Sequence, residues 1–452
     1  MINRRHFLGS GAAASAALLA RAKLATAQAP TPATPPAGGH AGHGAAHKVT
    51  VPITGAKLTQ GRAVAGASYT PVIVPNGATL PFELKGGVKV FHLIAEAVTH
   101  QIAPGLEIEA WGYNGGTPGP LIECVEGDAL RIYVTNKLPE PTTVHWHGVI
   151  VPNGMDGVSG LTQRPIPVGK TFMYEFTMRH AGTFMYHPHF DEMTQIALGM
   201  VGMIVVHPKR PTERRRVRDY ALMSHEWMIP IGARRPNPLA MSEFNVLTFN
   251  SKAFPGTEPL VAQTGDLVRI RLGNLGPMDS HPIHLHGYSF EVVATDGGTI
   301  PPARRIPETT AWLPVGATRV LEFVADNPGD WALHCHMTHH VMNQMGHEIP
   351  NLVGASTRGL DARVGRIVPG YMTMGDTGMG NMHAMELPEN SISMVGGAGP
   401  FGSIDMGGMF TILKVRDKLP AGIDPGWYEH PAGTVSLEAT AADLARDGIT
   451  AR

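Results

Sequence analysis

The chain has 452 residues, enough for two domains of ordinary size with extensions at both ends. Its 36 Lys and Arg side chains nearly balance 37 Asp and Glu, so charge gives no indication of binding to nucleic acid or to a membrane surface. The 54 Gly and 38 Pro residues favour a turn-rich β protein.

The first 27 residues predict an export signal. Arg4 and Arg5 precede an apolar, alanine-rich stretch over 12–20, and small residues close the segment at Ala27. This pattern is typical of a twin-arginine signal peptide and is too short for a membrane span. We therefore expect export to the periplasm, or otherwise through the twin-arginine pathway, and a disordered His/Pro/Ala-rich linker over 28–48.

Two stretches farther along the chain repeat one another. GDALRIYVTN at 127–136 returns as GDLVRIRLGN at 265–274, and a His-x-His-Gly motif follows each copy. Both copies alternate as strands do, which predicts an all-β protein built from two antiparallel sandwiches with Greek-key connections. The predicted boundaries are domain 1 over 49–208, domain 2 over 218–417 and a C-terminal tail over 418–452.

The second copy is longer near its C-terminal end. GMIVV at 202–206 soon follows the last histidine pair of the first copy, whereas its counterpart GMFTI stands at 408–412. The difference predicts an insertion over 347–405, which is rich in methionine and glycine.

The tripeptide His334-Cys335-His336 carries the most chemical information. Successive side chains of a strand point to opposite faces, so Cys335 faces away from both histidines. A thiolate, the imidazole of His340 and the thioether of Met345 match a trigonal blue-copper site with a weak axial ligand. The two flanking histidines are then free to hold a second copper centre.

Histidine pairs recur at three other places in the chain, 145–147, 187–189 and 284–286, with His281 close before the last. Four pairs in apolar, β-patterned surroundings point to metal binding, because buried imidazoles without partners are costly. In these motifs the sequence resembles the multicopper oxidases, over most of 105–346 and the last strand near 406–415. The resemblance implies cupredoxin folds and, since Pro188 replaces the cysteine in the first copy, a two-domain laccase-like type with its type 1 copper in domain 2.

The resemblance also implies a ligand set. The type 1 copper takes His281, Cys335 and His340, with Met345 as axial ligand and Met406 as a rival. The type 2 copper takes His145 and His284. The binuclear type 3 pair takes the other six histidines of the four pairs, namely His147, His187, His189, His286, His334 and His336.

Three further expectations concern groups near the coppers. Asp156 matches a family carboxylate that orients water and passes protons. Many bacterial members have a glutamate where this chain has Val341, which puts proton delivery on that side in doubt. Soft thioethers favour Cu(I), so the insertion is either an auxiliary copper site or a plain cover; the candidate ligands are Met372, Met374, Met379, Met382, His383 and Met385.

The expected function is oxidation of a reductant, either phenols or cuprous or other metal ions, coupled to reduction of dioxygen to water. Two alternatives stay open: a periplasmic copper-resistance protein that carries the metal as cargo, and a copper nitrite reductase. Pro188 and the full set of trinuclear ligands argue against the reductase. Two-domain relatives are homotrimers that share each trinuclear cluster between neighbouring chains, so a homotrimer is expected.

Overall fold

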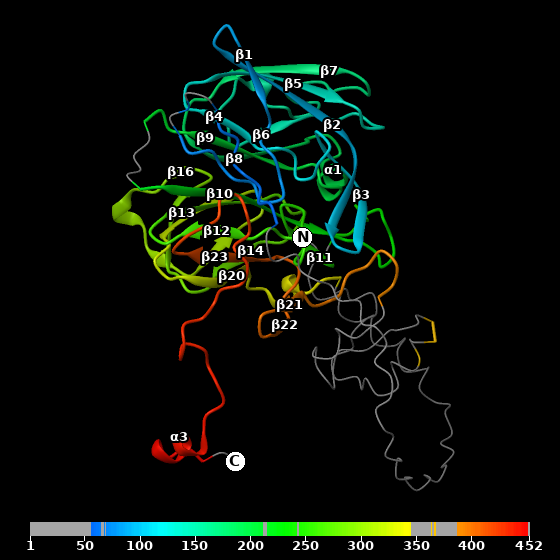
Figure 1. Ribbon diagram of the computed structural model, residues 1–452. Helices are drawn as coiled ribbons and strands as arrows, with labels where there is room; N and C mark the ends of the chain where they lie inside the picture. The colour runs from blue at the N-terminus through cyan, green and yellow to red at the C-terminus, as the bar shows by residue number, and fades with distance from the viewer. Residues whose placement is uncertain are drawn as a thin grey trace, which may run out of the picture. The chain divides into compact units, whose positions relative to one another are not determined.

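The computed structural model describes residues 56–344 and 387–450, apart from 65, 66, 68, 211–214, 242 and 243, together with 363, 366 and 367. Within this part the protein is built mainly of strands, as the all-β prediction requires (Figure 1). No helix in it is long and apolar enough to cross a membrane. The export signal, the linker and the five methionines proposed as auxiliary copper ligands lie outside the described residues.

The first sandwich consists of strands β1–β9 in two sheets. One sheet has the order β1-β2-β5-β7, with β3 on β2, and the other has the order β4-β9-β8-β6. Its elements are β1 (Phe82–Lys85), β2 (Val88–Ala103), β3 (Leu106–Tyr113), β4 (Ile122–Val125), β5 (Ala129–Asn136), β6 (His145–His147), η1 (Asn153–Met155), β7 (Thr171–Thr177), β8 (Gly182–His187), α1 (Glu192–Ala197) and β9 (Gly202–His207).

The second sandwich consists of strands β10–β20 and β23. One sheet has the order β11-β10-β13-β19-β15-β16, with β17 on β15, and the other has the order β12-β23-β20-β14-β18. Its elements are β10 (Val217–Trp227), β11 (Val246–Phe249), β12 (Leu260–Gln263), β13 (Leu267–Asn274), β14 (His281–Leu285), β15 (Phe290–Thr295), β16 (Gly298–Thr299), η2 (Pro302–Arg304), β17 (Pro307–Glu308), β18 (Thr310–Leu313), β19 (Thr318–Val324), β20 (Gly329–Cys335), η3 (Thr338–Val341) and β23 (Phe410–Arg416).

Smaller elements lie at the end of the predicted insertion and after the last strand. The hairpin of β21 (Gly397–Gly399) and β22 (Gly402–Ile404) precedes β23. Helix α3 (Ala441–Arg446) lies in the C-terminal tail. Thr440 caps it, because its side chain accepts a hydrogen bond from the Asp443 amide while the Asp443 side chain accepts one in return.

The repeated sequence forms the same strand in both sandwiches. β5 pairs in parallel with β2 and antiparallel with β7, and β13 does the same with β10 and β19. Alternation explains this, since every second residue of β5, from Leu130 to Asn136, is buried. Cys124 and Cys335 are each fully buried in the core of their own sandwich.

A buried ion pair joins the two sandwiches. Arg271 donates to both carboxylate oxygens of Asp219, at 2.7 and 2.8 Å, and to the hydroxyl of Thr183 in β8 at 2.8 Å. Burial opposes ionisation of Asp219, but the guanidinium of Arg271 holds the pKa of this carboxyl below its ordinary value. The ionised form of the buried Asp219 carboxyl therefore depends on the Arg271 guanidinium.

Replacing Arg271 with alanine should lower the free energy of unfolding by about 3 kcal/mol, because Asp219 would stay buried with only its longer contact to Arg269, at 3.3 Å. Urea denaturation measures the loss. The matched control is Arg131→Ala, which breaks the partly exposed pair with Glu175 and should cost less than about 1 kcal/mol. Equal losses in the two variants would contradict the predicted role of Arg271.

Candidate metal centres

Two histidines and a cysteine converge in the second sandwich. His281 opens β14, Cys335 ends β20 and His340 lies in η3. The Nδ1 atoms of His281 and His340 are 3.2 Å apart, and the Cys335 Sγ lies 3.9 Å from the first and 3.5 Å from the second. The three ligand atoms predicted from the sequence for the type 1 site therefore face a common point.

The chemistry of this group fits a bound cation. Burial lowers the pKa of His281 to about 3, so the ring is neutral and its Nδ1 lone pair is available. Burial also raises the pKa of the Cys335 thiol to about 12, and a cation at this point would favour the thiolate. One soft sulfur with two imidazoles is the donor set that suits copper.

A quartet of histidines stands at the edge of the first sandwich. It consists of His145 and His147 in β6 and His187 and His189 at the end of β8. Register places His145 opposite His187, with ring centroids 5.3 Å apart. The Nδ1 of His147 lies 3.3 Å from the Nε2 of His187, so these two nitrogens face each other.

A second quartet occupies the equivalent edge of the second sandwich. It consists of His284 and His286 in β14 and His334 and His336 around Cys335. His284 pairs with His334, and the Nε2 atoms of His286 and His334 are 3.1 Å apart. Ring contacts join the members within each quartet, and none of these described histidines has a ring contact with the other quartet.

Backbone carbonyls orient four of these rings. A carbonyl only accepts hydrogen bonds, so each ring donates from Nδ1 and leaves Nε2 free to bind a metal. The bonds run from His145 to Asp156, His187 to Pro188, His284 to Thr309 and His334 to Cys335, at 2.7–2.8 Å. Asp156 thus reaches His145 through its carbonyl, while its carboxylate lies 3.4 Å from the same Nδ1.

The structure describes Met406, the alternative axial ligand, but not Met345, the predicted one. Met345 lies outside the described residues, as do the methionines and His383 proposed for an auxiliary site. Met406 packs against the cluster of Phe254, Phe410 and Ile412, whereas Cys335 belongs to the main core of the sandwich. The axial ligand stays a prediction.

Three acidic residues near the histidines were not among the site residues predicted from the sequence. The Glu192 carboxylate lies 3.4 Å from the Nδ1 of His187 and 3.7 Å from the Nε2 of His189. Asp279 lies 3.7 Å from the Nε2 of His340, and Glu226 binds the backbone beside Asp279. Closeness in sequence to a ligand could have indicated Glu192 and Asp279, but nothing local marks Glu226.

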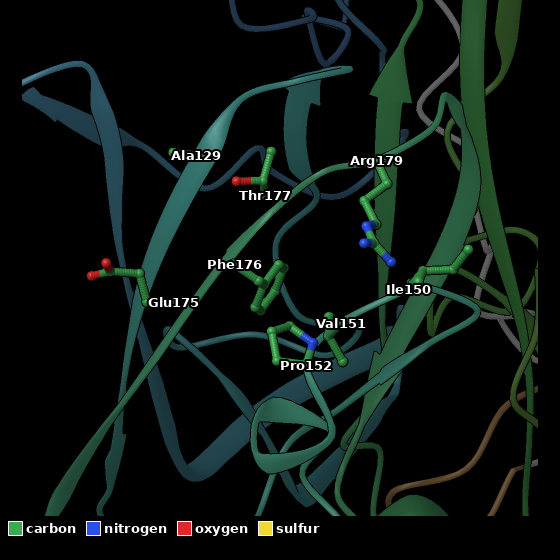
Figure 2. A pocket seen from close by; sticks show the side chains of 8 residues that line it. All are labelled: Ala129, Ile150, Val151, Pro152, Glu175, Phe176, Thr177 and Arg179. Atoms are coloured by element: carbon green, nitrogen blue, oxygen red, sulfur yellow. The ribbon is translucent and has the colours of Figure 1, made fainter.

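The predicted metal ligands line neither of two pockets that the structure contains. A pocket of about 440 Å³ lies against β7 and the loop at 150–152, with Glu175 and Arg179 on opposite sides of Phe176 (Figure 2). Another, of about 300 Å³, lies beside Lys252 and Lys414. In the second sandwich the metal ligands instead lie on or just after β14 and β20, which are neighbours in the sheet (Figure 1).

Comparisons with known proteins agree with this geometry. Two models described as multicopper oxidase match residues 95–211 and 230–354, which together make up more than half of the chain. The chain belongs to the multicopper oxidase family. Its cofactor is therefore copper, in the type 1, type 2 and type 3 centres of that family, and the cupredoxin-like sandwiches predicted from the sequence are confirmed.

Individual relatives place this multicopper oxidase more closely. It is 37% identical to copper resistance protein A of Escherichia coli over 27% of this chain and 20% of that protein, and 41% identical to laccase-1 of Cryptococcus neoformans over 25% and 19%. The matches thus span about a fifth of these relatives. The crystal structure of the blue copper oxidase from Nitrosomonas europaea is similar with a TM-score of 0.54 and 26% identity, over 72% of this chain and 85% of that one.

Proposed function

We propose that this multicopper oxidase couples one-electron oxidation of a reductant to the reduction of dioxygen to water. One observation carries the proposal. The Sγ of Cys335 faces His281 and His340, while the adjacent His334 faces His286 and donates a hydrogen bond to the carbonyl of Cys335 itself. Two metal centres would thus be joined by a single residue of backbone, which provides a short path for electrons.

These contacts support the proposed type 1 ligands, and the family supports the assignment of the eight quartet histidines to the type 2 and type 3 coppers. His281, Cys335 and His340 would hold the type 1 copper, His145 and His284 the type 2 copper, and the other six histidines of the quartets the type 3 pair. Bound copper supplies the redox chemistry, by which dioxygen takes up four electrons and four protons and leaves as two waters. The protein fixes the rings through carbonyl acceptors and keeps the Cys335 thiol away from solvent.

Asp156 would hold a proton beside this cluster. Its carboxylate is partly exposed and lies near the ring of His145, so it can exchange protons with solvent while the carbonyl of the same residue orients the ring. Asp156→Asn keeps the carbonyl and removes the titrating group. We expect turnover to fall about 10- to 100-fold with the blue absorption and the copper content unchanged. Loss of copper from this variant would show that the residue is structural instead.

The two quartets support a shared cluster between chains. Each quartet supplies four imidazoles, and within the described residues the two stay separate. Large apolar side chains are exposed near both, with Leu161 and Met193 by the first and Trp312 and Met337 by the second. Apolar surface around an incomplete metal site is expected where another chain docks. We propose the homotrimer, in which neighbouring chains complete each cluster.

Oxygen uptake tests the oxidase proposal. Purified, copper-loaded protein should consume oxygen when cuprous ion, manganous ion or a phenol is added, and the donor with the highest kcat/KM identifies the class of reductant. A relative named copper resistance protein A favours a second candidate, in which copper is cargo. That carrier would release bound copper to a chelator and consume no oxygen with any of the three donors.

The N-terminal segment concerns the cell compartment in which this reaction would take place. We propose export through the twin-arginine pathway to the periplasm or beyond, on the strength of Arg4 and Arg5 before an apolar stretch. Substituting both arginines with lysine should leave the protein in the cytoplasm of the expressing bacterium. Fractionation of cells followed by immunoblotting measures this, and unchanged export of the variant would contradict the proposed route.

A further inference from the structure

A buried carboxylate holds the loop that leads to the type 1 site. Glu226, in β10, accepts hydrogen bonds from the amides of Asp279, at 2.8 Å, and of Met278. Asn274 holds the same loop from its other side, since its amide nitrogen donates to the carbonyl of Asp279 at 2.8 Å. Glu226 is itself fully buried, so both contacts are shielded from water. Two side chains on neighbouring strands therefore fix the backbone of Asp279.

The loop that Glu226 holds places the Asp279 side chain beside His340. The Nδ1 of this ring faces Cys335, while its Nε2 on the outer edge lies 3.7 Å from the carboxylate of Asp279. The Asp279 side chain is 36% exposed, so it contacts solvent and the ring at once. A negative charge thus stands where a reductant would approach His340, and its position depends on the loop that Glu226 holds.

The first sandwich provides an internal comparison. Asn136 holds the equivalent loop there, donating to the carbonyl of Glu140 as Asn274 does to Asp279. Strand register pairs Ala95 with Asn136 and Ser224 with Asn274, so the counterpart of Glu226 is Ala97. The asparagine belongs to both copies of the fold, whereas the glutamate occurs only in the copy that has Cys335. Because the first sandwich forms the equivalent loop without a glutamate, the fold by itself does not require Glu226 to form this loop.

We propose that Glu226 is a positioning residue for electron entry, which holds Asp279 at the outer nitrogen of His340 and thereby favours positively charged reductants over negatively charged ones. The inference rests on the proposed function, because it takes His340 as a ligand of the type 1 copper. Glu226 acts only through Asp279 and need not touch the reductant. Attraction between the Asp279 carboxylate and a cation, and repulsion of an anion, supply the selectivity.

Two outer-sphere reductants of opposite charge test this without turnover. Hexaammineruthenium(II) is a cation and hexacyanoferrate(II) an anion; each gives one electron to the blue centre, becomes the trivalent metal complex and transfers no proton. Anaerobic stopped-flow mixing with copper-loaded protein follows the loss of the blue band and gives one rate constant for each. The ratio of the cation to the anion rate constant is the readout, and a role confined to folding would not move it.

The variants separate position from charge. Asp279→Asn should lower the ratio about tenfold, because the charge is gone. Glu226→Leu should lower it by a similar factor, although Asp279 is still present, because two loop amides lose their acceptor. Burial, and then the neighbouring Asp279 carboxyl, raise the pKa of Glu226 to about 8, so the acid is mostly neutral at pH 7. Glu226→Gln should therefore keep the ratio within about twofold of the wild-type value.

Controls and contrary outcomes complete the test. Glu123→Leu removes another buried carboxylate that accepts a backbone amide, from Val72 at 2.9 Å, and should leave the ratio unchanged. If Glu226→Leu does not fold, Glu226→Asp, which withdraws the carboxylate by one carbon, takes its place. A wild-type ratio in Glu226→Leu or Glu226→Asp, or in Asp279→Asn, would overturn the inference. A wild-type protein without a blue band would instead sink the proposed function.

Discussion

Replacing Cys335 with serine is expected to abolish the intense blue absorption and to lower turnover to below about one-thousandth of the wild-type rate. The absorption needs a thiolate bound to copper, and serine offers only a weakly acidic hydroxyl in the same place. The Cys335 sulfur, which is the first atom of the proposed electron path to the trinuclear cluster, would be absent. Because both histidine quartets are untouched, the trinuclear coppers should stay bound. Absorption spectroscopy, copper analysis and oxygen uptake measure the three quantities.

Cys124→Ser is the matched control for this change. Cys124 is the other cysteine of the chain, is equally buried, and its sulfur lies 3.9 Å from the carbonyl of Val205, to which a serine hydroxyl can donate. This variant should keep both the blue band and the turnover. A Cys335→Ser protein that stays blue would remove Cys335 from the type 1 site.

The sequence was sufficient to predict the strands and the four His-x-His pairs. Both are local properties, since alternation marks a strand and a His-x-His pair places two rings on one face. His145 and His147 therefore lie together, and so do His334 and His336. The grouping of two pairs into each quartet comes from the structure, in which β6 pairs with β8 and β14 pairs with β20.

Alternation and the repeat could not predict the roles of Glu226 and Asp279. Glu226 and Met278 are far apart in the chain and meet only because β10 runs parallel to β13. Asp279 stands in a loop whose direction depends on hydrogen bonds from Asn274 and Glu226, and no periodicity encodes a loop conformation. Asp156 was predicted from the family resemblance as a carboxylate near the coppers, whereas the contact with His145 that its backbone carbonyl makes, at 2.8 Å, was not predicted.

The separation of the two quartets leads to a genetic test of the shared cluster. A His145→Ala chain lacks part of the first quartet and a His334→Ala chain part of the second, so each homotrimer should be inactive. In a mixed trimer, some interfaces combine the intact first quartet of one chain with the intact second quartet of its neighbour. Around a threefold ring every mixed trimer has one such interface out of three, so purified mixed trimers should restore about a third of the wild-type oxygen uptake.

Co-expression with two different affinity tags and tandem purification isolates the mixed trimers for this measurement. The control combines His145→Ala with His147→Ala, two lesions in the same quartet, so no interface in any mixture has an intact first quartet and the activity should stay at the background level. Mixed His145→Ala and His334→Ala trimers that form but remain as inactive as this control would place each cluster within one chain. Recovery near a third would require the two quartets to meet across the subunit boundary, because neither chain alone carries a complete set of ligands.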